Sequence, residues 1–579
     1  MTTSNAISYA LHIPHSWRDL RLAPAPQVGT SCATLARVIS SHQTPKLFAV
    51  KLWSVSWQQP INAVFFHAKS WQKAQFSADK ELIIYGKTAI GFGGLIEFVQ
   101  PIVTAHSGVI EPVYKHVTKA FKAAIGELSL DALISDGLPL KVAQELFTLH
   151  KPTIAVPNVQ SAVVQYALKY AEIYLFLSQL RSKKTTLPSM AQITTSPAPF
   201  IRSLPFALTP DQLAAIAACQ NDIAKPTQAR RLIVGDVGCG KTLVMLAVAF
   251  MIGKQKTILM APTTILASQL FEEAQKYLKP FLSTAIVTQK AETDISSADL
   301  IIGTHALLYR SLPTAACVMI DEQHRFGTAQ RSKLSAMVSG AAGAKPHFFQ
   351  FSATPIPRSL AMIQSALLDI SAIRTMPFAK QTATSVIGRA DFKALLAQIT
   401  AELSAGNQAL IVYPLIEASE TNEYQSLEQA RGFWETRFDG VVVTHGKDKD
   451  KEAALVEFRE RGRILLATTV VEVGISLPRL TMVVIVGAER LGLATLHQLR
   501  GRVGRAGQKS QCFFYTNHTD NARLRTLAAT NDGFEVAEMD LQNRASGDML
   551  DGIIQSGNNF RFFDMTQDIR ILEEVKNTL

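Results

Sequence analysis

The chain has 579 residues, of which 47% are hydrophobic and 18% are charged. This composition excludes an intrinsically disordered protein, and the length corresponds to about four domains. Lysine and arginine together number 58, against 47 aspartate and glutamate residues, and the net charge of +11 favours an anionic partner such as nucleic acid.

The first part of the chain changes from strand signals to helix signals. Between residues 47 and 104, short runs rich in Val, Ile, Phe and Tyr are separated by turn residues, which predicts several strands and a small β-barrel. Helical spacing follows from Val113 to Lys184, and the Ser/Thr/Pro-rich stretch from Thr185 to Phe200 is typical of a linker. We therefore expect a short N-terminal segment (1–46), a barrel domain (47–156) and a helical linker (157–200).

The central part alternates apolar strands with helices in two successive segments. Near-continuous apolar runs such as LIV at 232–234 and CVMI at 317–320 are typical of parallel strands that helices cover on both faces. The pattern restarts after Met376. The predicted fold class is therefore α/β, with two parallel-sheet lobes at 201–378 and 379–516 and a mixed C-terminal region at 517–579.

The segment GDVGCGKT at 235–242 fits the phosphate-loop pattern G-x-x-x-x-G-K-[ST]. It follows an apolar strand and opens an apolar helix, which is the context that the motif requires. Its glycines let backbone N–H groups turn toward phosphate at a helix N-terminus that already favours anions. We predict that Lys241 reaches the β- and γ-phosphates of ATP and that Thr242 holds Mg²⁺. The residues expected to bind ATP are Gly235, Asp236, Val237, Gly238, Cys239, Gly240, Lys241 and Thr242.

Two further segments carry charges that suit phosphate chemistry. Asp321 and Glu322 end an apolar strand, where one carboxylate can hold Mg²⁺ through water and the other can activate the attacking water. Arg500, Arg502 and Arg505 lie close together, and their guanidinium groups match phosphate oxygens. They predict an arginine finger that reaches ATP from the second lobe, and a solvated basic loop is the alternative.

These segments together resemble the RecG-type ATP-dependent DNA helicases of superfamily 2. The match covers about residues 200–560 and includes GDVGCGKT, MAPTTILASQ, IIGTHALL, DEQHRFG, SATPIPRSLAM, TTVVEVGISLP and ERLGLATLHQLRGRVGR. The resemblance implies two RecA-like lobes after an oligonucleotide-binding (OB-fold) wedge barrel. It also implies an ATP- and Mg²⁺-dependent double-stranded DNA translocase that remodels replication forks and Holliday junctions in DNA repair and recombination.

The resemblance assigns roles to the residues at matching positions. The expected catalytic residues are Lys241, Asp321, Glu322, Gln498, Arg502 and Arg505, with Thr242 and Asp321 as the Mg²⁺ site, the latter through water. Phe206 and Gln212 are expected on the adenine side of ATP. The expected coupling residues are Ser352, Ala353, Thr354, Gly474, Arg544 and Gln555. Pro262, Thr263, Thr304 and His305 are expected to line the DNA strand.

The N-terminal region is similar to the RecG wedge at two adjacent phenylalanines, Phe65 and Phe66. Because neighbours on a strand point to opposite faces, one ring is expected to fill the barrel core and the other to stack on a DNA base. The alternative is an edge-strand ring that the next helix covers.

Four departures from the family pattern affect these expectations. The family usually begins with an additional helical segment, for which this chain leaves little room. Ser476 replaces an Asp of the second lobe, and Cys239 replaces a Ser of the phosphate loop, where the backbone does the binding. The segment NDGFEVAEMDLQNRASGDMLDGIIQSG resembles the translocation motif, but RGPG becomes Arg544-Ala-Ser-Gly547, one residue is inserted near Asp551, and Ile554 stands where Arg is common. We therefore expect slower or less efficient fork remodelling than in a relative with the full pattern.

Two other functions stay open at this point. The divergent translocation motif favours a branched-DNA-binding protein with a weakly coupled or vestigial ATPase motor, whereas the intact ATPase motifs oppose that interpretation. A transcription-repair coupling translocase requires a polymerase-binding domain, which the sequence does not obviously supply.

We expect neither a secretory signal peptide nor a membrane span in this sequence. Its five widely spaced cysteines form no CxxC zinc motif and do not indicate a disulfide framework. The N-terminus lacks a signal-peptide pattern, and the longest apolar stretch, Leu243 to Ile252, is too short to span a bilayer. We expect a cytoplasmic, nucleoid-associated monomer without membrane contact. Its expected partner is branched double-stranded DNA, and single-stranded DNA-binding protein is a candidate partner.

Overall fold

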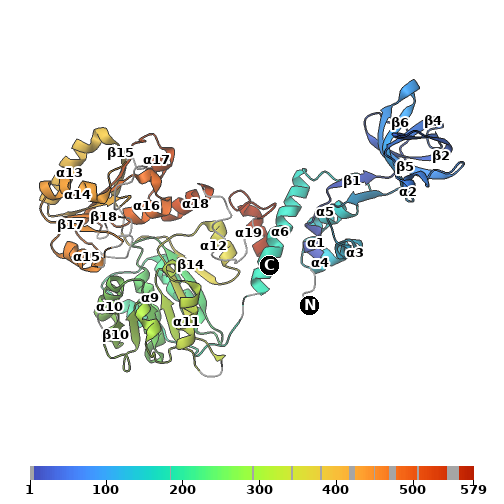
Figure 1. Ribbon diagram of the computed structural model, residues 1–579. Helices are drawn as coiled ribbons and strands as arrows, with labels where there is room; N and C mark the ends of the chain where they lie inside the picture. Colours follow the sequence, from blue (N-terminus) through green and yellow to red (C-terminus); the bar gives the residue numbers. More distant parts are fainter. Residues whose placement is uncertain are drawn as a thin grey trace. The chain divides into compact units, whose positions relative to one another are not determined.

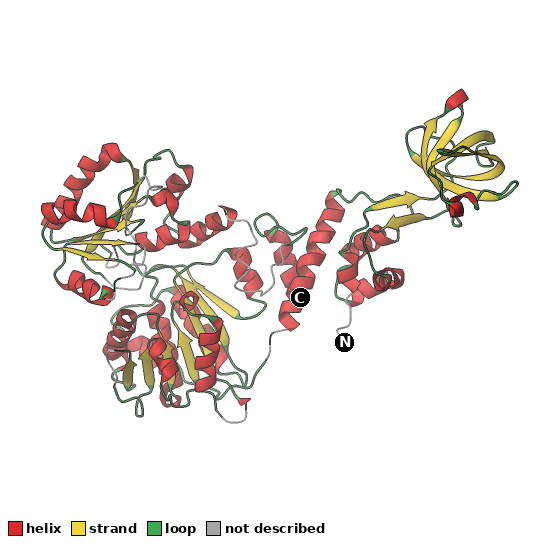
Figure 2. Ribbon diagram, viewed as in Figure 1, coloured by secondary structure: helices red, strands yellow, loops and turns green. Residues whose placement is uncertain are grey.

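The structure is a computed structural model that describes residues 6–579 except 183, 185, 290–292, 341–342, 379–380, 416–423, 447, 449, 469–476, 505–506 and 544–559. Two units make most of their contacts internally: residues 1–179 with 560–579, and residues 180–559. The first unit holds a barrel and a group of helices, and the second holds two α/β lobes (Figure 1, Figure 2).

A closed barrel of five strands lies in the first unit (Figure 2). In barrel order, the strands are β2 (Ser31–Gln43), β3 (Leu47–Ser54), β4 (Gln59–Phe66), β6 (Ile96–Thr104) and β5 (Glu81–Ile90). All neighbours are antiparallel except β4 and β6, which are parallel. A five-stranded barrel of this kind is the OB-fold architecture, so the predicted class of the N-terminal barrel is confirmed.

The barrel starts earlier in the chain than the sequence indicated. We predicted a barrel domain at 47–156 and a separate segment at 1–46, but β2 pairs with β3 and β5 from Ser31 onward. Two of the buried positions of β2 are alanines, Ala33 and Ala36, and the last five residues of the strand are exposed. Small inward residues and a polar end weaken the apolar alternation by which a strand is recognised. The barrel therefore extends beyond the predicted boundary.

A group of helices completes the N-terminal part of this unit. It comprises α1 (Ala6–Ala10), α3 (Lys119–Glu127), α4 (Leu130–Ser135) and α5 (Leu140–His150), beside a two-stranded ribbon of β1 (Ser16–Asp19) and β7 (Ile110–Val113). The short α2 (Ser70–Lys73) lies between β4 and β5. Thr118 and Ser129 cap α3 and α4 through their hydroxyl oxygens. The predicted change from strands to helices after Val113 is confirmed.

A buried histidine joins α5 to α1. Nε2 of His150 lies 2.9 Å from the Ala10 carbonyl, and Nδ1 lies 2.6 Å from the Tyr114 hydroxyl. Burial lowers the pKa of His150 to about 4, although the Ala10 carbonyl acts in the opposite direction. The folded side chain is therefore neutral over most of the mildly acidic range.

We expect the free energy of unfolding to fall by about 2 kcal/mol from pH 7 to pH 5, because the His150 side chain binds a proton in the unfolded chain but not in the folded one. The unfolded side chain gains its proton below an ordinary pKa of about 6.5. The folded one stays neutral until about pH 4, so acid favours the unfolded chain in this window. Urea unfolding followed by tryptophan fluorescence measures the effect, since the Trp17 indole donates to the Leu149 carbonyl at 2.8 Å. The His150→Gln variant should lose less stability between the two pH values, and an equal loss in both proteins would contradict the assignment.

The C-terminal helix α19 (Ile569–Thr578) packs against α6 (Ala162–Ser182) of the same unit (Figure 1). Lys169 pairs with Asp568 at 2.8 Å, and the Glu172 carboxylate accepts the backbone N–H groups of residues 561–563. The end of the chain is therefore held by the helix that we predicted as a linker (157–200). It does not form one body with the rest of the region predicted at 517–579.

The first lobe is a parallel sheet of seven strands in the order β10-β11-β9-β12-β13-β8-β14, flanked by helices (Figure 2). Its strands are β8 (Arg230–Gly235), β9 (Thr257–Met260), β10 (Thr284–Val287), β11 (Leu300–Gly303), β12 (Cys317–Ile320), β13 (His347–Ser352) and β14 (Asp369–Ile373). Its helices are α7 (Ala198–Ser203), α8 (Pro210–Ile223), α9 (Lys241–Ile252), α10 (Thr264–Leu278), α11 (Thr328–Met337) and α12 (Arg358–Gln364). The central strands β9, β11 and β12 are buried along their whole length, as helices on both faces require.

The second lobe is a parallel sheet of six strands in the order β15-β20-β19-β16-β18-β17. Its strands are β15 (Thr382–Ile387), β16 (Gln408–Tyr413), β17 (Val441–Thr444), β18 (Ile464–Thr468), β19 (Leu480–Val486) and β20 (Ser510–Tyr515). Its helices are α13 (Phe392–Ser404), α14 (Leu427–Arg437), α15 (Lys451–Glu460), α16 (Leu493–Arg500), α17 (Ala522–Ala529) and α18 (Gly533–Asn543). The predicted α/β class with two parallel-sheet lobes is confirmed. Within the described ranges, the structure contains no helix with the length and apolar character needed to cross a membrane.

Candidate functional site

The phosphate loop connects the end of β8 to the start of α9. Gly238 and Gly240 have φ angles of 87° and 82°, in the left-handed region that favours glycine. A β-carbon on Gly235 would lie 2.4 Å from the Cys239 sulfur, so this position also lacks room for a side chain. The loop therefore turns its backbone at the N-terminus of α9, where the helix dipole favours an anion.

Lys241 is the first residue of α9, and its ammonium lies within the loop. Nζ donates to the Gly235 carbonyl at 2.7 Å and to the Asp236 carbonyl at 3.0 Å. The Cys239 side chain is buried, with its sulfur 3.9 Å from the same ammonium. Cys239 therefore presents no side-chain atom to a nucleotide, whereas Lys241 needs to leave two carbonyls to reach a phosphate.

The two residues predicted on the adenine side differ in their surroundings. Gln212 is buried; it completes a capping box with Thr209 at the start of α8 and donates through Nε2 to the Cys239 carbonyl at 2.8 Å. Phe206 is exposed, and its ring meets the Tyr277 ring edge-on at 6.1 Å between centroids. Gln212 thus supports the phosphate loop, while Phe206 and Tyr277 line the cleft beside it, as Phe378 also does. Tyr277 was not predicted from the sequence, because no motif surrounds it.

The acidic pair follows β12, at the carboxyl edge of the sheet that also carries the phosphate loop. Asp321 is buried, and this burial, together with the charge of Glu322, raises its pKa to about 7 although Lys241 opposes the shift. Glu322 has a left-handed backbone, with φ of 47°, and its Oε2 accepts the Ala353 N–H at 3.1 Å. A buried carboxylate needs a nearby cation to stay charged. Asp321 and Thr242, which line one cleft, therefore fit a Mg²⁺ ion.

The turn Ser352–Thr354 lies at the end of β13 and is hydrogen-bonded to Glu322 of the acidic pair. The hydroxyls of Ser352 and Thr354 lie 2.7 Å apart, and the backbone N–H of Ala353 between them holds Glu322. A movement of Glu322 during hydrolysis therefore reaches this turn directly, which supports the coupling role predicted for its three residues. The other predicted coupling residues, Gly474, Arg544 and Gln555, lie outside the described residues.

Both lobes line a single cleft of about 680 Å³. The first lobe contributes Lys241, Thr242, Asp321 and Glu322, and the second contributes Gln498 and Arg502. Lys451, at the start of α15, also lines the cleft. It was not predicted from the sequence, since a lone lysine belongs to no motif. Six of the residues predicted for nucleotide chemistry are therefore brought together across the two lobes: Lys241, Thr242, Asp321, Glu322, Gln498 and Arg502.

The three clustered arginines of the second lobe, Arg500, Arg502 and Arg505, are not equivalent in the structure. Arg502 lies in the cleft and is 6% exposed. Arg500 is also buried, but it donates to the Leu527 carbonyl at 2.8 Å and to Nδ1 of His497 at 2.8 Å. Arg505 lies outside the described residues. Among the described arginines of this cluster, Arg502 is the one that lines the cleft together with the phosphate loop, as an arginine finger needs to.

The residues predicted to line DNA on the first lobe follow β9 and β11 at one edge of the sheet. The hydroxyls of Thr263 and Thr304 cap α10 and the 3₁₀ turn at 305–309. Pro262 and Thr263 line the nucleotide cleft, Thr304 is buried, and His305 is exposed. The Thr304 side chain therefore has a structural role, whereas the exposed His305 side chain can contact a ligand from solvent.

The phenylalanine pair ends β4 of the barrel. Phe65 is 1% exposed and packs against the rings of Phe48 and Phe76, with centroids 6.0 and 5.4 Å away. Phe66 is 53% exposed, so the helix α2 that follows does not cover it. The predicted division of the pair into a core ring and an outward ring is confirmed. Trp71 in α2 is a second outward ring, 61% exposed, which was not predicted from the sequence.

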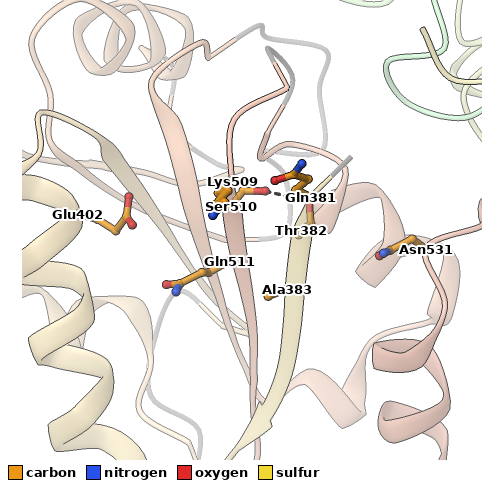
Figure 3. Close-up of a pocket in the computed structure, with 8 residues that line it drawn as sticks. All are labelled: Gln381, Thr382, Ala383, Glu402, Lys509, Ser510, Gln511 and Asn531. Carbon is orange, nitrogen blue, oxygen red and sulfur yellow. Dashed lines mark hydrogen bonds between the residues drawn. The ribbon is translucent and has the colours of Figure 1, made fainter. Parts of the chain in front are cut away.

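A second hollow of about 560 Å³ lies in the second lobe, where β15 and β20 begin (Figure 3). Glu402 and Lys509 are the charged residues that line it, and Glu402 already accepts the Asn407 amide and the Thr481 hydroxyl. No predicted site residue lies there. Because ligands of parallel sheets bind at the carboxyl ends of the strands, the cleft at the phosphate loop is the better candidate for the functional site.

A phosphate loop and acidic pair on one parallel-sheet lobe, facing a buried arginine of a second lobe, define a nucleotide-driven motor of the helicase class. Comparison with known families agrees. Residues 209–363 match the model of DEAD/DEAH box helicases, and residues 391–507 match that of the helicase conserved C-terminal domain. The chain belongs to the RecG family of ATP-dependent DNA helicases, because it is 40% identical to a RecG helicase over 98% of its own length.

Two relatives and one solved structure support this assignment. The chain is 40% identical over 588 residues to the ATP-dependent DNA helicase RecG of Helicobacter pylori strain J99, which covers 98% of this chain and 94% of the relative. It is 33% identical over 545 residues to RecG of Aquifex aeolicus, which covers 83% of this chain and 68% of the relative. A solved structure of RecG bound to a three-way DNA junction superposes with a TM-score of 0.57 at 26% identity, over 97% of this chain and 81% of that chain.

Proposed function

We propose that this protein is an ATP-driven motor that moves on double-stranded DNA and remodels branched DNA, such as replication forks and Holliday junctions, in repair and recombination. The observation that carries the proposal is the cleft in which Lys241, Asp321 and Glu322 face Arg502 of the other lobe. The RecG structure that is similar to this chain was solved with a three-way DNA junction, which supports branched DNA as the substrate.

Each residue of the cleft has a distinct part in the proposed hydrolysis of ATP. Thr242 and Asp321 would hold a Mg²⁺ ion, which would neutralise phosphate charge. Lys241 leaves the loop carbonyls to pair with the β- and γ-phosphates. Glu322, which the Ala353 N–H holds in place, accepts a proton from the attacking water. Arg502 stabilises the charge that develops on the γ-phosphate.

The barrel supplies the proposed contact with the branch point. The exposed ring of Phe66 can stack on an unpaired base, a contact worth about 1–3 kcal/mol, and Trp71 offers a second ring close by in the chain. The net charge of +11 favours binding to the DNA backbone. We further propose that one copy of the chain suffices, because it carries both the motor and the barrel, and that single-stranded DNA-binding protein is a partner on the separated strands.

A second candidate function is a branched-DNA-binding protein whose ATPase motor is weakly coupled. The observation that favours it is the sequence of the translocation motif, in which Ile554 replaces an arginine and Ser476 of the second lobe replaces an aspartate. A guanidinium offers several donors that isoleucine lacks. These changes are therefore expected to affect the coupling of ATP hydrolysis to movement on DNA more than hydrolysis itself. The complete set of cleft residues favours the motor.

We expect ATP hydrolysis to be stimulated most by a model replication fork, less by linear duplex and least without DNA. The Lys241→Ala variant should abolish hydrolysis, because the phosphates lose the ammonium that neutralises them. Lys254→Ala, at an exposed lysine of the same lobe that pairs with Asp299 at 2.9 Å, is the matched control and should retain activity. Steady-state hydrolysis with the three DNA conditions is the measurement. Fork binding without stimulated hydrolysis would favour the second candidate function instead.

A further inference from the structure

A hydrogen bond joins the phosphate loop of the first lobe to α16 of the second. The carboxylate oxygens of Asp236 lie 2.8 and 2.9 Å from Nε2 of His497, and both side chains are buried. Asp236 is the second residue of the loop, and His497 lies five residues before Arg502 in sequence. The pair thus connects the two segments that the proposed mechanism places around the phosphates.

The neighbour of His497 fixes the direction of this bond. Arg500 Nη2 lies 2.8 Å from Nδ1 of His497, and a guanidinium has donors but no acceptor. Nδ1 therefore accepts, and Nε2 carries the hydrogen that is donated to Asp236. Arg500 also donates to the Leu527 carbonyl, at the end of α17. Three side chains in series thus connect the phosphate loop to the body of the second lobe.

The backbone of Asp236 depends on the position of Lys241. Its carbonyl accepts the Lys241 ammonium at 3.0 Å, and its carboxylate accepts the Val237 N–H at 2.6 Å. When Lys241 turns toward a phosphate, the first of these bonds is lost and the peptide of Asp236 can shift. The hydrogen bond to His497 then carries this shift to α16.

The first residue of α18 lies directly against this hydrogen bond. A β-carbon on Gly533 would be 2.7 Å from Nε2 of His497, 2.9 Å from Oδ2 of Asp236 and 2.8 Å from Cγ of Pro355. All three distances are shorter than van der Waals contact. Pro355 immediately follows the turn that holds Glu322. Glycine at 533 therefore allows α18, the phosphate loop and α16 to meet at one point.

Both lobes hold the rest of α18. Phe534 packs with Leu232 and Val234 of β8, and the Arg374 guanidinium lies 4.2 Å above its ring. The Glu538 carboxylate accepts the backbone N–H of Arg358 at the start of α12. On the other side, α18 packs against α16 (Figure 1). The whole of α18 lies within the segment 531–557 that resembles the translocation motif, so a change at its first residue is passed along a helix of that segment.

We propose that Asp236, His497 and Gly533 form a coupling joint that passes the state of the phosphate loop to α18. This inference rests on the proposed function for its purpose, which is to turn ATP hydrolysis into movement on DNA, but the joint itself is defined by contacts within the motor. Gly533 and His497 are positioning residues: neither lies in the nucleotide cleft, and both act through Asp236.

The first test follows the joint without DNA. Amide hydrogen exchange of residues 533–543 is measured in the full chain with and without Mg²⁺ and a non-hydrolysable ATP analogue. In the wild type, the analogue should change exchange in α18, and in Gly533→Ala this response should be lost. The matched control is Gly432→Ala in α14, where an added β-carbon meets nothing within 4 Å. A wild-type helix that does not respond to the nucleotide, or a Gly533→Ala helix that responds as the wild type does, would overturn the proposal.

The second test measures coupling. For Gly533→Ala we expect hydrolysis without DNA to stay within about twofold of the wild type, and forks unwound per ATP hydrolysed to fall by about tenfold or more. His497→Ala should give a similar loss, and combining it with Gly533→Ala should add little, because both break one hydrogen bond. If Gly533→Ala does not fold, His497→Ala decides in both tests. A wild type that unwinds no forks contradicts the proposed function, while the exchange experiment still decides on the joint.

Discussion

Replacing Arg502 with alanine is expected to lower the turnover number of ATP hydrolysis by about 10³-fold or more. Arg502 is 6% exposed and lines the cleft from the second lobe, together with Lys241 and the acidic pair of the first lobe. In a site with little water, a fixed positive charge beside the γ-phosphate stabilises the charge that develops during transfer far more than it stabilises bound ATP. The affinity for ATP should therefore change much less than the turnover number.

The measurement is steady-state hydrolysis at saturating ATP and fork, together with the dissociation constant of a non-hydrolysable ATP analogue. Arg502→Lys keeps the charge but loses the planar set of donors, so we expect partial recovery at most. Arg461→Ala is the matched control, because that side chain is 79% exposed on the same lobe and makes a long contact of 4.0 Å with Glu457. A loss of ATP affinity with an unchanged turnover number would mean that Arg502 binds the ground state instead.

The nucleotide cleft could be predicted closely from the sequence because its parts are local. Each motif sits at the end of a strand that its own apolar residues specify, as with Gly235–Thr242 after β8 and Asp321–Glu322 after β12. In a parallel sheet the carboxyl ends of the strands meet at one edge. Order along the chain was therefore enough to place the loop and the acidic pair together.

The joint could not be predicted, because no local pattern indicates that its three residues, which lie in three separate motifs, contact one another. His497 is one polar residue in a helix, and its partner Asp236 is 261 positions away. Gly533 does not have a left-handed backbone, so the usual reason for a glycine does not apply. What excludes a side chain there is the approach of two other segments, which only the fold brings about.

Two elements of the first unit also could not be placed from the sequence. The pattern of α19 predicts a helix, and its apolar residues Ile571, Leu572 and Val575 are buried on one face. Nothing in that pattern identifies α6, about 400 residues earlier, as the partner. Strand β2 was missed for a different reason, since the inward alanines give it little apolar contrast.

We expect the two neighbouring phenylalanines of the barrel to give opposite results when each is replaced by alanine. Phe65→Ala should destabilise the barrel by about 3–5 kcal/mol, because it leaves a cavity beside the rings of Phe48 and Phe76. Phe66→Ala should change the free energy of unfolding by about 0.5 kcal/mol or less, since the ring is 53% exposed. Urea unfolding of the two variants and the wild type measures this difference.

The affinity for DNA should show the reverse order once folded protein is compared. Loss of one base-stacking contact, worth about 1–3 kcal/mol, should weaken fork binding by Phe66→Ala roughly 5- to 150-fold. Binding to linear duplex, and hydrolysis stimulated by it, should stay close to the wild type, because duplex offers no unpaired base. Phe433→Ala, at an exposed ring of α14 in the second lobe, is the matched control. If Phe66→Ala binds forks as tightly as the wild type, the Trp71→Ala variant separates two explanations: a weakened fork complex there assigns the stacking to Trp71, and an unchanged one excludes aromatic stacking at this end of the barrel.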